Sequence, residues 1–82
     1  MIVLKFGGSS VADAACMRQV AGLVKAALPS APLVVLSAMG KTTNGLFDAA
    51  RAAEGGDLAE AMARQRTLMA AHREAASQLF EG

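Results

Sequence analysis

The first ten residues combine a short apolar run, an embedded lysine and a pair of glycines, and this combination constrains the fold most strongly. Residues 2–6, Ile-Val-Leu-Lys-Phe, are mostly β-formers, which predicts a strand covered on both faces. Lys5 is unexpected there, because lysine is costly to bury unless it is paired. Gly7 and Gly8 follow at once and would let backbone N–H groups approach an anion beside the charge of Lys5. The pattern predicts a phosphate-binding loop, and a nucleotide is the simplest source of the phosphate.

A helix and a second strand are predicted after this loop. Apolar residues recur at helical spacing from Met17 to Leu28, Ser9 or Ser10 offers a cap, and two prolines beyond Leu28 end the helix. Residues 33–36, Leu-Val-Val-Leu, predict a second buried strand. A strand–helix–strand crossover of this length implies parallel strands and an α/β fold.

Two further helices are predicted in the second half of the chain. Thr42, Thr43 or Asn44 would cap the first of them, which ends near two glycines at 55 and 56. Asp57 would cap a long final helix that reaches about Phe80. The binding crevice of a parallel α/β sheet lies outside the carboxyl ends of its strands. We therefore expect residues 7–9 and 37–44 to share one rim of the sheet.

Composition limits the class of protein. The chain has 82 residues, of which 54% are hydrophobic and 18% charged, which excludes a disordered chain. So small a unit has a marginal core, so we interpret residues 1–82 as a single partial domain of a larger fold. The net charge of +1 gives no electrostatic case for nucleic acid or for an anionic membrane. A single cysteine and the lack of an apolar stretch of about 20 residues predict a cytoplasmic location.

Several motifs also have simpler interpretations. A pair of glycines alone is usually only a turn, and the case for Gly7 and Gly8 rests on their context. Gly40-Lys41-Thr42 resembles the end of a Walker A loop, but that motif requires a glycine five residues earlier, where this chain has Val35. His72 has no partners at metal-ligand spacing and is interpreted as a structural or surface residue; no metal ligands are predicted.

Two segments resemble a known family. Residues 3–13, Val-Leu-Lys-Phe-Gly-Gly-Ser-Ser-Val-Ala-Asp, closely resemble the N-terminal signature of the aspartokinases, within the amino acid kinase superfamily. Residues 33–44, Leu-Val-Val-Leu-Ser-Ala-Met-Gly-Lys-Thr-Thr-Asn, resemble the second strand and loop of the same family. The family usually has threonine where this chain has Ser9, which keeps the hydroxyl. The helical remainder of the chain carries no motif of comparable weight.

The resemblance implies a fold, a reaction and a set of site residues. It implies the N-terminal part of a three-layer αβα sandwich with a mainly parallel sheet. The implied reaction is ATP-dependent phosphorylation of L-aspartate to 4-phospho-L-aspartate, the first step toward lysine, threonine and methionine, with Mg²⁺ bridging the phosphates. The family's phosphate-binding positions match Lys5, Gly7, Gly8 and Ser9, with Lys5 neutralising the transferring phosphoryl group. The aspartate-binding positions match Ser37 and Thr43.

Two alternatives to an aspartate kinase stay open at this point. One is a kinase for another small carboxylate such as glutamate, and the other is a non-catalytic module that binds an anion or a protein partner. Because aspartokinases are several hundred residues long, we expect the 82-residue chain to be inactive alone. We also expect a homo-oligomer, and self-association of the short chain through uncovered strand edges.

Overall fold

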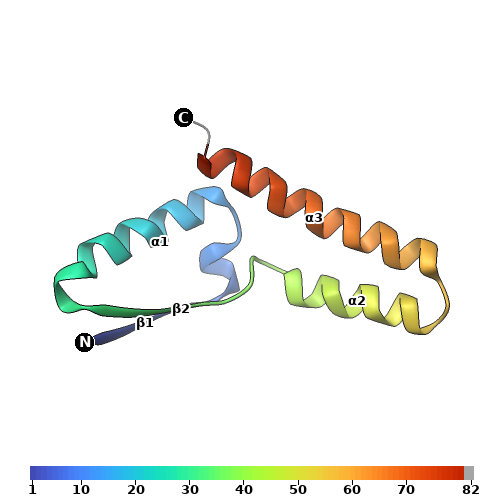
Figure 1. Ribbon diagram of the computed structural model, residues 1–82, viewed down its shortest axis with the longest axis horizontal. Helices are drawn as coiled ribbons and strands as arrows, with labels where there is room; N and C mark the ends of the chain where they lie inside the picture. The colour runs from blue at the N-terminus through green and yellow to red at the C-terminus, as the bar shows by residue number, and fades with distance from the viewer. Residues whose placement is uncertain (81–82) are drawn as a thin grey trace. The chain divides into compact units, whose positions relative to one another are not determined.

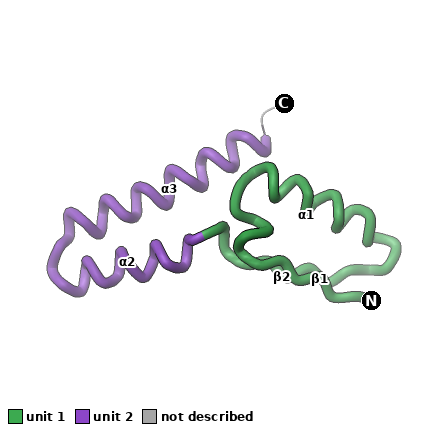
Figure 2. The backbone as a smooth tube through the Cα atoms, turned by 180° about the vertical axis from the view of Figure 1, so that it is seen from behind, with its two compact units in different colours: residues 1–40 green, residues 41–82 purple. Residues whose placement is uncertain are grey.

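The computed structural model describes residues 1–80 and divides into two compact units, residues 1–40 and the residues from Lys41 onward (Figures 1 and 2). Seven elements follow one another along the chain: β1 (Ile2–Phe6), η1 (Gly8–Val11), α1 (Ala14–Ala27), η2 (Leu28–Ser30), β2 (Pro32–Leu36), α2 (Thr42–Glu54) and α3 (Leu58–Phe80). The order is the predicted one, and η1 and η2 are two short 3-10 helices that the sequence pattern did not predict. In the described residues, no helix is both long and apolar enough to cross a membrane.

The first unit is a parallel β–α–β arrangement. The two strands pair in parallel, with Ile2 opposite Pro32 and Phe6 opposite Leu36, as the crossover predicts. Helix α1 lies against one face of this sheet (Figure 1). Val11, Ala14 and Val20 are the buried apolar side chains of this unit. The core therefore lies between α1, η1 and the sheet.

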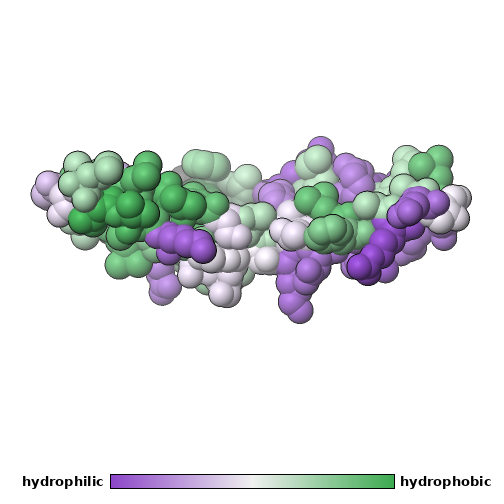
Figure 3. Space-filling view, turned by 90° about the horizontal axis from the view of Figure 1, so that it is seen from below, coloured by the Kyte–Doolittle hydropathy of each residue, from purple (hydrophilic) through white to green (hydrophobic). Residues whose placement is uncertain are grey.

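The opposite face of the sheet is uncovered within this unit. Val3 is 62% exposed, Leu33 52% and Val35 44%. The prediction that both faces of the strands are covered is thus wrong for the first unit, because its one α-helix packs on one side only. Figure 3 shows apolar side chains gathered over the first unit. An apolar groove of about 570 Å³ also opens beside β2, lined by residues such as Val24, Leu28 and Leu36.

The helix caps differ from those predicted. Ser9 and Ser10 lie inside η1, so neither caps α1, and the cap is Asp13, whose side chain accepts a hydrogen bond from the Cys16 backbone N–H. The chain needs the short 3-10 turn to redirect itself from the sheet edge, which moves the helix start beyond the serines. Helix α2 begins at Thr42, and its N-cap residue is Lys41, whose side chain makes no capping hydrogen bond.

The second unit is a pair of helices. Helices α2 and α3 run alongside each other in opposite directions (Figure 2). Gly56, at φ +83°, makes the turn between them, and Asp57 caps α3 as predicted, accepting from the Glu60 N–H at 3.0 Å. The helices approach closely at Gly45, and Arg64 of α3 forms ion pairs with Asp48 and Glu60.

Candidate functional site

The carboxyl ends of β1 and β2 meet at one edge of the sheet. Beyond the last paired residues, the Ser37 N–H donates a hydrogen bond of 3.0 Å to the Phe6 carbonyl oxygen. Further along the two loops, the Gly40 N–H donates to the Gly8 carbonyl oxygen at 3.1 Å. The segments 7–10 and 37–40 therefore lie side by side, as expected of loops that follow parallel strands.

The loop after β1 exposes backbone N–H groups. Gly7 is extended, at φ −78° and ψ 177°, and the chain then curls into η1. The first hydrogen bond of this turn runs from the Ser10 N–H to the Gly7 carbonyl oxygen at 3.1 Å. The N–H groups of Gly8 and Ser9 precede that bond, so the turn itself gives them no carbonyl partner. These two donors and the exposed Ser9 hydroxyl are the groups available to an anion at this loop.

Lys5 is exposed and lies on the uncovered face of the sheet. Phe6 borders a hollow together with residues of α1, so it faces that helix. Because successive side chains of a strand point to opposite faces, Lys5 points away from α1. Lys5 lies two residues before Gly7, so it stands at the same end of β1 as the loop donors. The sequence pattern predicted a buried Lys5, which would cost free energy. Because the lysine is exposed, this cost does not arise.

The first unit brings together five of the six predicted site residues. Lys5, Gly7, Gly8 and Ser9 are contiguous at the end of β1, and Ser37 is held beside them by its bond to the Phe6 carbonyl group. Ser37 is exposed. The sixth residue, Thr43, is exposed in the first turn of α2 and belongs to the second unit.

The sequence pattern placed Gly40 in the second loop of this edge but did not predict its role there. Gly40 adopts φ +51°, in the left-handed region that favours glycine, and its N–H binds the Gly8 carbonyl oxygen. Its position directly between a strand and a helix was the available signal, because such junctions often need a positive φ.

Asp13 is the one carboxylate of the first unit, and it is occupied as a helix cap. The hydrogen bond from the Cys16 backbone N–H, 2.8 Å long, lowers the pKa of the Asp13 carboxyl group. The same carboxylate raises the pKa of the Cys16 thiol, chiefly by side-chain hydrogen bonding. Asp13 is therefore ionised at neutral pH and committed to the start of α1.

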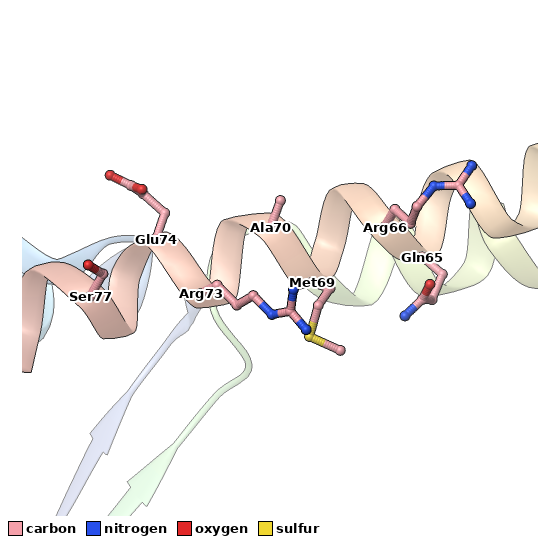
Figure 4. Close-up of a pocket in the computed structure, with 7 residues that line it drawn as sticks. All are labelled: Gln65, Arg66, Met69, Ala70, Arg73, Glu74 and Ser77. Carbon is pink, nitrogen blue, oxygen red and sulfur yellow. The ribbon is translucent and has the colours of Figure 1, made fainter.

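A shallow hollow of about 720 Å³ lies along α3, away from the predicted site residues. Seven residues of this helix line it: Gln65, Arg66, Met69, Ala70, Arg73, Glu74 and Ser77 (Figure 4). Figure 4 shows the side chains of Arg66 and Glu74 pointing away from each other along the helix. The lining residues follow one stripe of a single helix, which is typical of a solvated helix face.

Metal-ligating side chains do not gather in the described part of the chain. Within residues 1–80, no three His, Cys, Asp or Glu side chains come close enough to hold a metal ion. His72 is exposed on α3, with its Nδ1 atom 2.7 Å from the Leu68 carbonyl oxygen, as expected of a surface histidine.

Comparison with known proteins identifies the family. The model of the amino acid kinase family matches residues 1–81. The chain belongs to this family. Its mixed α/β fold with a parallel pair of strands is consistent with a part of the family's fold, and membership implies the use of ATP at the level of the family.

Three aspartokinases of Arabidopsis thaliana are similar to part of the chain. Aspartokinase 1, chloroplastic, is 58% identical over 45 residues, which is 55% of this chain and 8% of that protein. Aspartokinase 2, chloroplastic, is 55% identical over 47 residues, 57% of this chain and 9% of that protein. Aspartokinase 3, chloroplastic, is 60% identical over 45 residues, which is 55% of this chain and 8% of that protein. The chain thus matches less than one tenth of the length of each relative.

Proposed function

We propose that this chain forms the phosphate-binding part of an aspartate kinase, which transfers the γ-phosphoryl group of ATP to the side-chain carboxylate of L-aspartate. The observation that carries the proposal is the pairing of two loops at the sheet edge. One loop has backbone donors and a lysine, and the other has a serine hydroxyl, in a chain of the amino acid kinase family. The similarity to three aspartokinases favours aspartate over other acceptors.

Each predicted residue has a part in this reaction. A carboxylate oxygen of aspartate forms a bond to the γ-phosphorus, the bond from that phosphorus to the β–γ bridging oxygen breaks, and ADP leaves with the electron pair. Negative charge spreads over the transferring group, and the Lys5 ammonium group would stabilise it. Gly7, Gly8 and Ser9 would hold the phosphates through N–H and hydroxyl donors. Ser37 and Thr43 would bind the aspartate.

Magnesium is part of the proposal only as a companion of ATP. When bound with ATP, it would supply positive charge that neutralises the phosphates. The described residues offer no cluster of acidic side chains, and Asp13 is committed to capping α1, so no residue among 1–80 is assigned to the metal.

The proposal also covers the extent and surroundings of the chain. We propose that residues 1–82 are one part of a catalytic domain, because β1 and β2 leave apolar side chains such as Val3 and Leu33 largely exposed. The isolated chain would then be inactive, and further elements would cover these side chains. We also retain the predictions of a cytoplasmic homo-oligomer. Cell fractionation and the mass of the purified protein test these two points.

The experiment is a hydroxylamine trap with the complete gene product that contains residues 1–82. Acyl phosphates react with hydroxylamine, so an aspartate kinase forms aspartyl hydroxamate when ATP and L-aspartate are both present. The proposal expects this product with L-aspartate and none with L-glutamate. A hydroxamate formed with L-glutamate but not with L-aspartate would support the alternative of a kinase for another small carboxylate. ATP binding without either product would support the alternative of a binding module.

A further inference from the structure

The two adjacent glycines of the first loop have different surroundings. A Cβ atom added to Gly7 would meet nothing within 4 Å. A Cβ atom added to Gly8 would lie 2.9 Å from the Gly40 carbonyl oxygen and 3.3 Å from the Ala38 carbonyl oxygen. Both neighbours are backbone atoms, which cannot rotate aside as a side chain can. The chain's own packing therefore requires glycine at position 8 and leaves position 7 open.

Gly40 needs glycine for another reason. A Cβ atom there would be 3.8 Å from the nearest atoms of Ala12, an ordinary contact, but the backbone adopts φ +51°. This conformation directs the Gly40 N–H to the Gly8 carbonyl oxygen at 3.1 Å. We refer to the hydrogen bond and the close approach of Gly8 and Gly40 together as the Gly8–Gly40 contact.

We propose that the Gly8–Gly40 contact is a positioning device that holds the two loops at a fixed separation. This inference rests on the proposed function. The contact holds the phosphate loop against residues 37–40 at one end, and the bond from the Ser37 N–H to the Phe6 carbonyl oxygen holds them at the other. It thereby fixes the distance between the phosphoryl donor and an acceptor bound at Ser37.

The size of the expected effect follows from the geometry. An ordinary contact of a Cβ atom begins at 3.4 Å, so a side chain at Gly8 would move the loops apart by about 0.5 Å from the present 2.9 Å. Phosphoryl transfer requires the reacting oxygen and phosphorus in near contact, and a misplacement of about 1 Å can reduce the rate about 10²-fold. A shift of this kind lowers kcat more than it changes the binding of ATP.

The test compares three glycine variants of the complete gene product. Gly8→Ala is expected to speed hydrogen exchange of the Gly40 amide and to lower kcat about tenfold, with the KM for ATP little changed. Gly7→Ala is expected to keep the slow exchange of Gly40, because nothing lies within 4 Å of its added Cβ atom. Gly22→Ala, in α1 with nothing within 4 Å of the added Cβ, is the matched control for both measurements.

The outcomes separate this inference from the proposed function. If folded Gly8→Ala keeps the slow Gly40 exchange and full kcat, or if Gly7→Ala speeds that exchange, the inference is overturned. If Gly8→Ala does not fold, Gly40→Ala decides in its place. Alanine disfavours the φ of +51° that directs the N–H group of residue 40 to Gly8, so the same loss of protection at position 40 and of kcat is expected. A wild-type protein inactive on aspartate would refute the proposed function alone, because the exchange of the Gly40 amide reports on the Gly8–Gly40 contact whether or not the protein phosphorylates aspartate.

Discussion

Lys5 of β1 lies opposite Val35 of β2 in the parallel register, on the sheet face that α1 leaves uncovered. Val3 and Leu33 form the neighbouring pair, and both are more than half exposed. The candidate phosphate-binding lysine thus stands among apolar side chains that the first unit does not cover. A face of this kind promotes association with other protein surfaces.

We expect the 82-residue chain to self-associate through this face and the strand edges beside it. Leu33→Lys combined with Val35→Lys should reduce the association, because it places charge on the uncovered face. Light scattering across a range of concentrations measures the mass. Ser77→Lys, on the exposed side of α3, controls for added charge. A wild-type chain that stays a monomer at high concentration would contradict this prediction.

The Asp13 cap predicts a pH dependence of stability. Its carboxyl group has a pKa below the ordinary 3.8 because it accepts the Cys16 N–H, so ionised Asp13 stabilises the folded state. A lowered pKa means that this stabilisation is complete above the ordinary value and is lost as pH falls through the folded-state pKa. Asp13→Ala should therefore lower the Tm by a few degrees at neutral pH, and the difference should shrink between about pH 5 and about pH 2.

The control for this prediction is Asp13→Asn. Asparagine caps helices about as well as aspartate and carries no charge, so this variant should keep most of the Tm at neutral pH. Its Tm should also lack the loss at low pH that protonation of Asp13 causes in wild type. A constant difference between wild type and Asp13→Ala across the whole range would show that the charge of Asp13 contributes nothing.

Ala31 is expected to be a site where glycine stabilises the fold. It adopts φ 50° and ψ 70° after η2, the one positive φ among the described non-glycine residues. A left-handed conformation costs an L-residue about 1–2 kcal/mol, and glycine avoids this cost while losing about 0.4–1 kcal/mol of unfolded-state entropy. Ala31→Gly should therefore raise the free energy of unfolding by up to about 1.5 kcal/mol. Chemical denaturation measures this free energy. A denaturation midpoint lower than that of wild type would contradict the prediction that Ala31 is strained.

Gly45 sets the distance between α2 and α3. A Cβ atom at this position would lie 2.7 Å from Cδ2 of Leu68. Alanine should be nearly neutral, because the end of the leucine side chain can move and helix propensity improves by about 1 kcal/mol. Gly45→Leu should destabilise the helix pair by about 1–3 kcal/mol through overpacking.

Thermal unfolding followed by helical circular dichroism measures this change. Leu68→Ala introduced into the Gly45→Leu variant should restore part of the lost stability, because it makes room for the new side chain. If the double variant is as unstable as the sum of the two single changes, Gly45 and Leu68 do not meet in the protein.

The strands and their pairing were predictable from local patterns. Residues 2–6 and 33–36 are apolar and rich in β-formers, and one helix between them leaves a parallel pair as the available arrangement. The helix starts were less predictable. Ser9, Ser10 and Asp13 all have side chains that can cap a helix, and the 3-10 turn that selects Asp13 depends on how the chain leaves the sheet.

The candidate site was predictable only in part. The glycines and Lys5 follow directly from the first strand, so their place at the sheet edge could be predicted from the sequence. The role of Gly40 could not be predicted, because its positive φ and its bond to Gly8 arise only when the two loops meet. The distinction between Gly7 and Gly8 also depends on atoms about 30 residues away in the sequence.

The central claim is that Lys5 stabilises the phosphoryl group transferred to aspartate. The most direct measurement is the rate of aspartyl hydroxamate formation by the complete gene product, compared among wild type, Lys5→Ala and Lys25→Ala. Both lysines are exposed, so neither change should unfold the protein. We predict a loss of about 10²–10³-fold for Lys5→Ala, and a rate close to wild type for Lys25→Ala. An active wild-type enzyme that Lys5→Ala leaves unchanged would contradict the account.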